Sequence, residues 1–365
     1  MKTKAAVLYE PRKPLRVEEV ELGPVKPQDV LVRIAASGVC HSDVHVYQGQ
    51  EGWPMPMVLG HEGAGIVEQV GSAVASVKPG DHVVINLAPF CGQCRDCTRG
   101  RIYRCLRRRG PSGTLYDGHT RLSKNGKPIY HYVNSATYAK HAIIHESSAI
   151  KIASDIPLDK ACLVGCALPA GMGAALNTAQ VEPGSNVLVI GCGGVGLNVI
   201  QGCRLAGAAK IIAVDILESK LQLAREFGAT HLIDASMENT RKRVQELTEN
   251  IGVDYAFEVI GRIDTIMDAY ESVCRGGKAV VVGIGPDGSH IPIPPRSLVS
   301  EKTLTGTQFG STNAVRDFPT YLELYTLGKI KIDELITKYR PLEEINQAFA
   351  DLEQGKVIRT ILRMD

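Results

Sequence analysis

Long apolar runs are missing from the sequence. No segment approaches about eighteen unbroken apolar residues, the minimum for a candidate transmembrane helix. The first residues, MKTKAAVLYEPRKP, contain no apolar stretch of the kind that a secretory signal peptide carries. We therefore expect no membrane partner and a cytoplasmic location.

An excess of charge of one sign is also missing. The 41 lysines and arginines nearly balance the 39 acidic residues, and the formal net charge is +2. This balance argues against nucleic acid or an anionic membrane as a partner. The exception is a run of six arginines between Arg99 and Arg109, which we interpret as the solvated face of a loop.

The 365 residues are enough for two domains with separate cores. Residues 1 to about 90 contain short β-type runs separated by glycine and proline, which predicts a compact all-β or mixed domain without a long helix. From about residue 184, apolar runs alternate with helical segments, which predicts an α/β fold with a doubly wound parallel sheet. The last section is expected to contain helices near 314–327 and 342–354. Its final strand, VIRTILR, is expected to return to the first domain.

Close cysteine spacing is the strongest local signal. The segment CGQCRDCTRGRIYRC has the pattern C-x2-C-x2-C-x7-C, formed by Cys91, Cys94, Cys97 and Cys105. Four thiolates complete the tetrahedral shell of zinc and leave no open position, so this zinc would be structural. An iron–sulfur cluster is the alternative, but the run lacks the C-x3-C-P ending of bacterial ferredoxins. After it, residues 107–141 are predicted to form a long irregular excursion.

Two further residues of metal-binding types lie within the segment CHSDVHVYQGQEGWPMPMVLGHE, near its ends. Cys40 and His61 stand near its two ends and suit zinc. A catalytic zinc usually has three protein ligands and one open position. Cys166, in LVGCALPAG, is our candidate for the third ligand. In the alternative interpretation, Cys40 and His61 are ordinary buried residues of a core.

Four residues between or beside these ligands can hold or pass a proton. They are Ser42, Asp43, His45 and Glu62. The alternative for Ser42 and His45 is that they cap a short helix after Cys40.

A glycine-rich turn stands between a predicted strand, SNVLVI, and a predicted helix, LNVIQGCRLAGA. The turn matches G-x-G-x-x-G, and Asp215 follows nineteen residues after its last glycine, at the end of another apolar run. Such glycines let a pyrophosphate approach the backbone and the helix N-terminus. The acidic residue would bind the adenosine ribose and repel a 2′-phosphate, so NAD is preferred over NADP. The alternative is a tight turn with a capping aspartate. The predicted dinucleotide site is Gly191, Gly193, Gly194, Val195, Gly196 and Asp215.

Together these motifs resemble the zinc-dependent alcohol dehydrogenases of the medium-chain dehydrogenase/reductase superfamily. The resemblance covers essentially the whole chain and rests on GHEGAGIVEQVGSAV, the four-cysteine run, GCGGVG with Asp215, and IRTIL near the C-terminus. VGCALPAGMGAALNTAQV and the stretch from TGTQFG to ELIT are most similar to the bacterial branch near the mycothiol- and nitrosoaniline-dependent enzymes.

The resemblance implies a domain organisation, cofactors and an assembly. It implies a GroES-like catalytic domain at 1–166 and 309–365, with a structural-zinc lobe at about 88–110, and a Rossmann NAD-binding domain at 167–308. Each chain would hold two zinc ions, one structural and one catalytic, with NAD between the domains. A homodimer or homotetramer is expected.

The resemblance also implies roles for single residues. Asp43 would orient the ligand histidine, and Glu62, behind the metal, would assist ligand exchange. Ser42 would take the substrate proton first and His45 would deliver it to solvent. Contacts to the cofactor would come from His41, Lys220 and Arg359.

The implied activity is hydride transfer between NAD(H) and a primary, aromatic or allylic alcohol or its aldehyde. A second hypothesis is oxidation of formaldehyde bound to a small thiol, with the arginines near the lobe holding the anionic adduct. A third, a catalytically idle NAD-binding regulator, is disfavoured by the complete set of zinc ligands together with Ser42 and His45.

Overall fold

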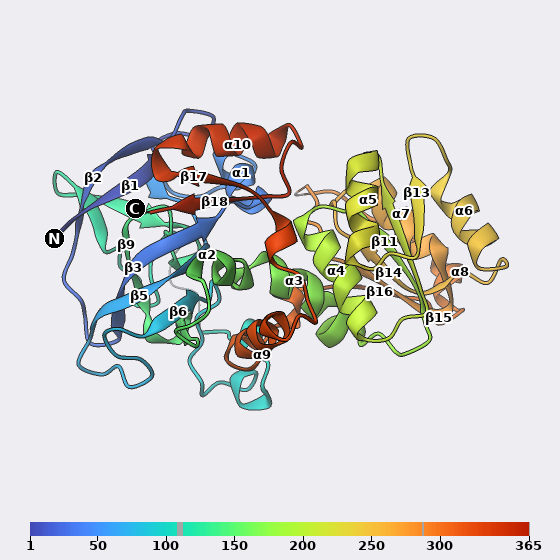
Figure 1. Cartoon of the computed structure of the whole chain (residues 1–365), viewed down its shortest axis with the longest axis horizontal. Helices are drawn as coiled ribbons and strands as arrows, with labels where there is room; N and C mark the ends of the chain where they lie inside the picture. Colours follow the sequence, from blue (N-terminus) through green and yellow to red (C-terminus); the bar gives the residue numbers. More distant parts are fainter. Residues whose placement is uncertain (108–111, 287, 365) are drawn as a thin grey trace. The chain divides into compact units, whose positions relative to one another are not determined.

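The computed structural model describes residues 1–107, 112–286 and 288–364 (Figure 1). Arg108 and Arg109 of the arginine run lie outside the described residues. The chain forms two compact units, Met1–Cys166 with Asn313–Asp365, and Ala167–Thr312. Within the described ranges no single helix is long and apolar enough to cross a membrane. One bent helix pair, Leu158–Gly165 with Ala167–Ala179, is long and apolar enough when its two helices are taken together, by length and composition only.

The first unit is built mainly from β-strands, as predicted. A closed barrel has the order β1-β2-β7-β8-β4, and a second sheet has the order β10-β6-β5-β3-β18-β17, with β9 also paired to β3. The strands are β1 (Lys2–Leu8), β2 (Arg16–Leu22), β3 (Asp29–Gly38), β4 (Met57–Val58), β5 (Glu62–Val70), β6 (His82–Ile85), β7 (Leu122–Lys124), β8 (Lys127–His131), β9 (His141–His145), β10 (Ala149–Lys151), β17 (Ile336–Pro341) and β18 (Arg359–Arg363).

Strand β3 is the central element of this unit. Its residues Val30, Val32 and Ile34 are buried, and the strand pairs with β5, β9 and β18. Burial of such β-branched residues against neighbouring strands is the main favourable term in the stability of a sheet of this kind. The C-terminal strand β18 therefore lies beside the strand that leads to Cys40. The helices of this unit are α1 (His41–Tyr47), α2 (Leu158–Ala161), α9 (Ala314–Thr326) and α10 (Ile345–Glu353).

The prediction of an irregular excursion over residues 107–141 is wrong in part. Strands β7 and β8 form an antiparallel hairpin in this region, with Lys124 opposite Lys127. The two residues of its turn, Asn125 and Gly126, have φ values of +51° and +73°. Asn-Gly readily adopts such left-handed conformations and is a strong sequence signal for a tight hairpin. The signal was present in the sequence, but the many glycines around it concealed the hairpin.

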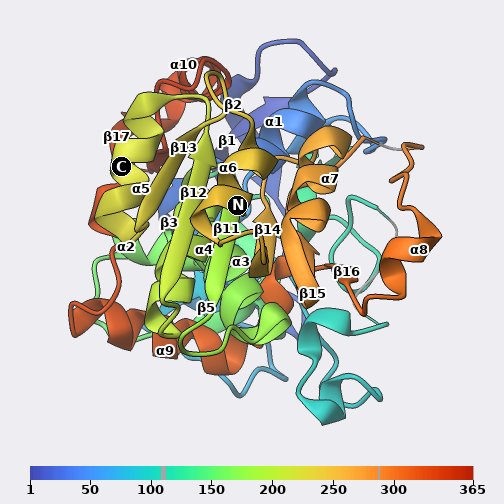
Figure 2. The ribbon, with the colours of Figure 1, turned by 90° about the vertical axis from the view of Figure 1, so that its right-hand side faces the viewer.

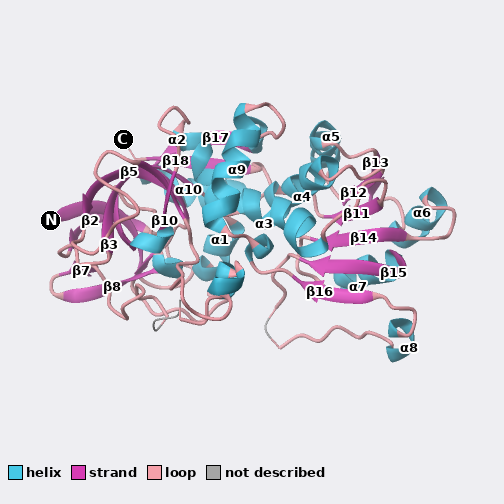
Figure 3. Cartoon of the chain, turned by 90° about the horizontal axis from the view of Figure 1, so that it is seen from below, coloured by secondary structure: helices cyan, strands magenta, loops and turns pink. Residues whose placement is uncertain are grey.

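The second unit contains a parallel sheet with the strand order β13-β12-β11-β14-β15-β16 (Figures 2 and 3). Helices α4 and α5 pack together on this sheet, as do α6 and α7. The order runs outward in both directions from β11 and β14, which is the doubly wound arrangement, and it confirms the predicted α/β class. The strands are β11 (Asn186–Ile190), β12 (Lys210–Asp215), β13 (His231–Asp234), β14 (Val253–Glu258), β15 (Val273–Val281) and β16 (Thr303–Gly306), and the helices are α3 (Ala167–Gly173), α4 (Gly194–Leu205), α5 (Glu218–Phe227), α6 (Thr240–Leu247), α7 (Ile263–Ser272) and α8 (Pro295–Leu298).

Candidate active site and metal centres

Two thiols, an imidazole and a carboxylate converge in the first unit. Cys40 follows β3, and His61 directly precedes β5. Because β3 and β5 are antiparallel, with Gly38 opposite Glu62, the end of one strand meets the start of the other. Cys166 arrives from a separate segment, after the turn that follows α2. One ligand atom from each of Cys40, His61, Glu62 and Cys166 lies within 4.8 Å of all the others.

Glycines allow these segments to approach closely. A Cβ atom at Gly38 would lie 2.1 Å from Oε2 of Glu62, so a larger residue there would displace the carboxylate. Gly165 lies against Ile85 and Glu62, and its Cβ would be 3.1 Å from the carbonyl oxygen of Ile85. Residues without a side chain therefore occupy the two positions where the segments that carry Cys40 and Cys166 approach their neighbours.

Glu62 provides the test of whether these residues fit a cation. Its side chain is fully buried, and neither carboxylate oxygen has a hydrogen-bond partner among the described residues. Burial raises the pKa of Glu62 to about 7, opposed by Arg359, whose Nη2 lies 3.9 Å from Oε1. Arg359 balances part of this charge, but a buried carboxylate that accepts no hydrogen bond is still costly, and a metal cation would lower that cost. Two sulfurs and one ring nitrogen are also the donors that zinc prefers, so the site fits zinc.

Asp43 contacts the imidazole of His61. Its fully buried carboxylate lies 3.2 Å from Nδ1 of His61 and accepts hydrogen bonds from the backbone N–H of Gly60 at 2.9 Å and from the hydroxyl of Tyr138 at 2.9 Å. If Nδ1–H of His61 donates to Asp43, Nε2 is free to bind a metal. Burial would lower the pKa of His61, but Asp43 and Cys40 raise it well above its ordinary value. An orienting role for Asp43 requires this contact, and the role itself stays a prediction.

Ser42 and His45 lie on the short helix α1, three residues apart. The helix begins after Cys40, which is its N-cap, so the alternative in which Ser42 and His45 cap it does not apply. Oγ of Ser42 lies 3.7 Å from Sγ of Cys40, beside the cluster. His45 is half-buried, and its role as the exit for the proton stays a prediction.

Tyr132 is a neighbour of the site that the sequence did not indicate. Its hydroxyl donates to the carbonyl oxygen of Ser42 at 3.3 Å, and its ring packs edge-on against His61 and Trp53. No spacing motif marks Tyr132, because it reaches the cluster only through the fold of the segment after β8.

The four-cysteine cluster is compact. Sγ of Cys94 lies 3.4 Å from that of Cys97 and 4.0 Å from that of Cys105, and Cys91 lies 4.0 Å from Cys97. Sulfurs about 2.3 Å from one central zinc would be about 3.8 Å apart. The backbone N–H of Cys97 lowers the pKa of Cys94 to about 6, which favours a thiolate. The spacing suits a single ion better than a cluster of several irons.

The glycine turn of the second unit lies between β11 and α4. Gly191 has a φ of +97°, and a Cβ at Gly196 would lie 1.8 Å from the carbonyl oxygen of Gly191. Both positions therefore require glycine. A Cβ at Gly193 would meet nothing within 4 Å, so the start of α4 is open to a ligand.

Asp215, at the end of β12, is tied to this turn. Its Oδ2 accepts from the backbone N–H of Cys192 at 2.8 Å, and its Oδ1 accepts from Ile216 at 2.8 Å and Leu217 at 3.1 Å. The carboxylate thus stabilises the turn, as in the alternative interpretation. Binding of a ribose by Asp215 is compatible with this role and stays a prediction.

The remaining predicted cofactor contacts are spread over both units. His41 is exposed at the start of α1, and Lys220 is half-buried on α5. Arg359 is buried in β18, where its guanidinium faces Glu62. The predicted contacts of these three residues to the cofactor stay predictions.

Comparisons with known protein families match both units. A model of the alcohol dehydrogenase GroES-like domain matches residues 26–154, and a model of the zinc-binding dehydrogenases matches residues 194–326. The first match lies in the barrel unit that carries the two cysteine-rich clusters. The second begins at the start of α4 and includes the rest of the parallel sheet.

Three solved structures are similar over the full length. A protein from Burkholderia ambifaria, described as an alcohol dehydrogenase zinc-binding domain protein, is 34% identical, covers 100% of this chain and 99% of its own, and has a TM-score of 0.95. Benzyl alcohol dehydrogenase from Acinetobacter calcoaceticus is 31% identical with 100% coverage of both chains and a TM-score of 0.95. A protein from Sinorhizobium meliloti 1021, described as a zinc-binding dehydrogenase bound to NADP, is 25% identical with 100% coverage of both and a TM-score of 0.83. With two zinc-type donor clusters in a GroES-like unit joined to a doubly wound sheet, the chain belongs to the zinc-binding alcohol dehydrogenases of the medium-chain dehydrogenase/reductase superfamily.

Proposed function

We propose that the protein transfers hydride between NAD(H) and a primary, aromatic or allylic alcohol or its aldehyde. The observation that carries this proposal is the convergence of Cys40, His61 and Cys166, which come from three separate segments, within 4.8 Å of one another. Structural needs alone do not explain three such donors around a buried carboxylate that has no hydrogen bond among the described residues.

Cys40, His61 and Cys166 would hold a catalytic zinc. Bound there, zinc supplies Lewis-acid chemistry that lowers the pKa of a coordinated hydroxyl; a drop like that of zinc-bound water, from about 15.7 to about 7, is worth about 12 kcal/mol. Asp43 holds the imidazole of His61 in one orientation. Glu62 has a carboxylate oxygen within 4.8 Å of the three donor atoms, from where it would assist the exchange of alcohol for water.

The proton of the alcohol needs a route to solvent. Ser42 lies beside Cys40 and can accept this proton through its hydroxyl. His45, one helical turn further along α1, would pass it on. Since neither residue stabilises the developing charge directly, their removal is expected to slow turnover less than loss of a zinc ligand.

Replacement of Asp43 by asparagine is expected to weaken zinc binding and activity by about 10–100-fold. An amide cannot accept from Gly60, His61 and Tyr138 at once, so the imidazole of His61 loses its fixed orientation. Tyr138→Phe serves as a milder variant because it removes one of these donors only. Zinc content after dialysis against a chelator measures the effect, and an Asp43→Asn protein that retains zinc like the wild type would contradict the role of Asp43.

NAD is proposed as the cofactor because Asp215 would repel a 2′-phosphate. The structure of the Sinorhizobium meliloti relative contains NADP, so a protein of this fold can bind the cofactor that carries the 2′-phosphate. Replacement of Asp215 by glycine is expected to raise the ratio of kcat/KM for NADP to that for NAD by about tenfold or more. The hydrogen bond to Cys192 is also lost, so affinity for NAD should fall as well. Asp234→Gly, at the end of the neighbouring strand, is the control, and an unchanged ratio in Asp215→Gly would show that another group sets the preference.

The substrate proposal favours aromatic alcohols. The ring of Tyr132 packs against His61, the ring of Trp53 packs against Tyr132, and one relative is a benzyl alcohol dehydrogenase. We place the protein in the bacterial branch near the nitrosoaniline- and mycothiol-dependent enzymes and expect a homodimer or homotetramer.

A panel of alcohols followed by NADH absorbance tests the activity. Formaldehyde with and without glutathione or mycothiol separates it from thiol-adduct oxidation, since only the latter requires the thiol.

A further inference from the structure

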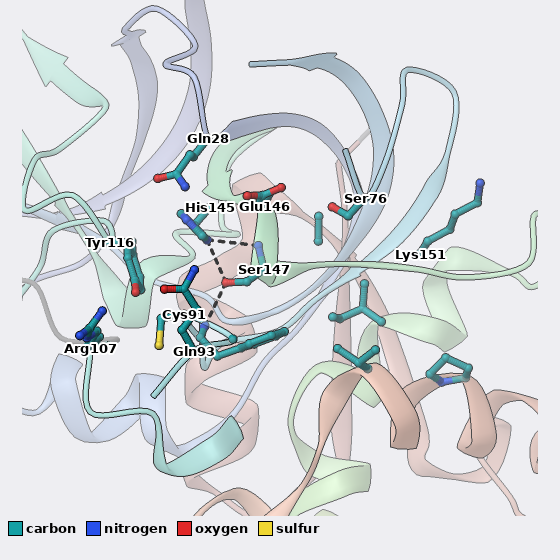
Figure 4. Close-up of a pocket in the computed structure, with 16 residues that line it drawn as sticks. Gln28, Ser76, Cys91, Gln93, Arg107, Tyr116, His145, Glu146, Ser147 and Lys151 are labelled. Carbon is teal, nitrogen blue, oxygen red and sulfur yellow. Dashed lines mark hydrogen bonds between the residues drawn. The ribbon is translucent and has the colours of Figure 1, made fainter. Parts of the chain in front are cut away.

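A cavity of about 670 Å³ lies in the first unit, beside the four-cysteine lobe (Figure 4). Cys91 and Phe90 of the lobe, His145 at the end of β9 and Val315 of α9 are among its lining residues. It shares no residue with the cluster of Cys40, His61, Glu62 and Cys166. Small-molecule sites are commonly roughly 300–1,000 Å³ in volume, so the cavity can hold a small organic ligand.

His145 presents an unused hydrogen-bond donor in the wall of this cavity. The side chain is 8% exposed, and its Nδ1 accepts from the backbone N–H of Ser147 at 3.1 Å. The hydroxyl of Ser147 lies 2.8 Å from Nδ1; its oxygen accepts from the backbone N–H of Phe90, so its O–H also donates to Nδ1. With Nδ1 acting as the acceptor, the proton of the neutral ring resides on Nε2. Nε2 is buried and has no hydrogen-bond partner among the described residues. A buried N–H without an acceptor costs free energy, and an acceptor entering the cavity would remove this cost.

A positive charge and an aromatic face lie on the same side of the cavity as His145. The ring of Tyr116 stacks on His145 with the centroids 4.5 Å apart, and Figure 4 shows Arg107 beside Tyr116. The Arg107 side chain is exposed and makes no ion pair within the described ranges. Lys151, on the opposite side of the view, is already paired with Asp81 at 2.8 Å. Arg107 is therefore the cation available to a ligand.

We propose that this cavity binds a small monocarboxylic acid with an aromatic or apolar body, at a site separate from the catalytic cluster. The carboxylate would lie between the guanidinium of Arg107 and Nε2–H of His145, because an arginine fork matches the two oxygens of a carboxylate. Phe90 and Val315 would cover the apolar body. Glu146, which also lines the cavity, disfavours a dianion.

Benzoate is the probe for this site, measured by calorimetric titration of the zinc-loaded full chain. Arg107→Gln is expected to weaken benzoate binding about tenfold, the loss of one charge-assisted interaction. Arg101→Gln is the matched control, because Arg101 is exposed in the same lobe but does not line the cavity, and it should change the affinity less than about twofold. Benzamide, which has the same shape without the charge, should bind the wild type at least about tenfold more weakly than benzoate does.

A second variant tests the location of the site. Val315→Phe enlarges a side chain that is 55% exposed, so the fold should tolerate the change while the cavity is filled. Loss of benzoate binding with unchanged turnover would support the proposal. Equal affinity of the wild type and Arg107→Gln, or full displacement of benzoate by an alcohol substrate, would overturn it, because benzoate would then occupy the catalytic site.

Discussion

Replacement of Cys166 by alanine is expected to lower turnover at least about thousandfold, since Lewis-acid activation supplies several kcal/mol of the catalytic effect. Cys166 is the proposed third zinc ligand and comes from a segment remote from Cys40 and His61. Without it the metal keeps too few protein ligands to be retained. Zinc content should fall from two ions per chain to one, while the four-cysteine site and cofactor binding remain.

Cys162→Ala is the matched control for this variant. Cys162 is fully buried four residues earlier and belongs to neither metal cluster of the described residues, and burial raises its pKa well above the ordinary value. Its loss removes a small apolar group only, so zinc content and turnover should stay near the wild-type values. A Cys166→Ala protein that retains two zinc ions or substantial turnover would show that the metal is held by other residues.

Replacement of Cys97 by alanine is expected to unfold the four-cysteine lobe. The described residues of the lobe form only short 3₁₀ turns and include few apolar side chains, so metal binding would supply the free energy that folds it; such sites are worth roughly 10–16 kcal/mol in isolated zinc-binding peptides. The exposed residues Arg99, Arg101 and Arg104 then become flexible trypsin sites. Limited trypsin digestion with mass spectrometry should show cleavage at these arginines at least about tenfold faster than in the wild type.

Cys203→Ala is the control for the lobe. Cys203 is a fully buried cysteine of α4 that belongs to neither metal cluster, and its replacement should leave the lobe cleavage rate and zinc content unchanged. If Cys97→Ala kept two zinc ions and resisted trypsin like the wild type, the four cysteines would not form a structural zinc site.

Much of the fold could be predicted because local sequence patterns indicate its helices and strands. Apolar runs separated by helical segments after residue 184 predicted the parallel sheet, and the helices near 314–327 and 342–354 correspond to α9 and α10. The hairpin of β7 and β8 was missed although Asn125 and Gly126 mark its turn. Strand β17 was also missed, because its sequence, ITKYRP, contains two charged residues and no alternation of apolar and polar residues.

The candidate sites also differ in how far the sequence alone predicted them. The four cysteines are within one short segment, so their spacing alone predicted a cluster, and the glycine turn with Asp215 is a local strand–turn–helix motif. Cys40, His61 and Cys166 were selected by chemistry and resemblance, but their approach within 4.8 Å depends on the pairing of β3 with β5 and on the small residues Gly38 and Gly165.

The sequence by itself determined the residue types that can bind zinc and a dinucleotide, because spacing within a segment limits which side chains can share a ligand. Only the tertiary structure decided which distant residues meet. It brought Arg359 to Glu62, Tyr132 to His61 and Arg107 to the cavity beside Tyr116. Such contacts arise from long-range strand pairing and packing, and no local pattern encodes the position of one segment against another.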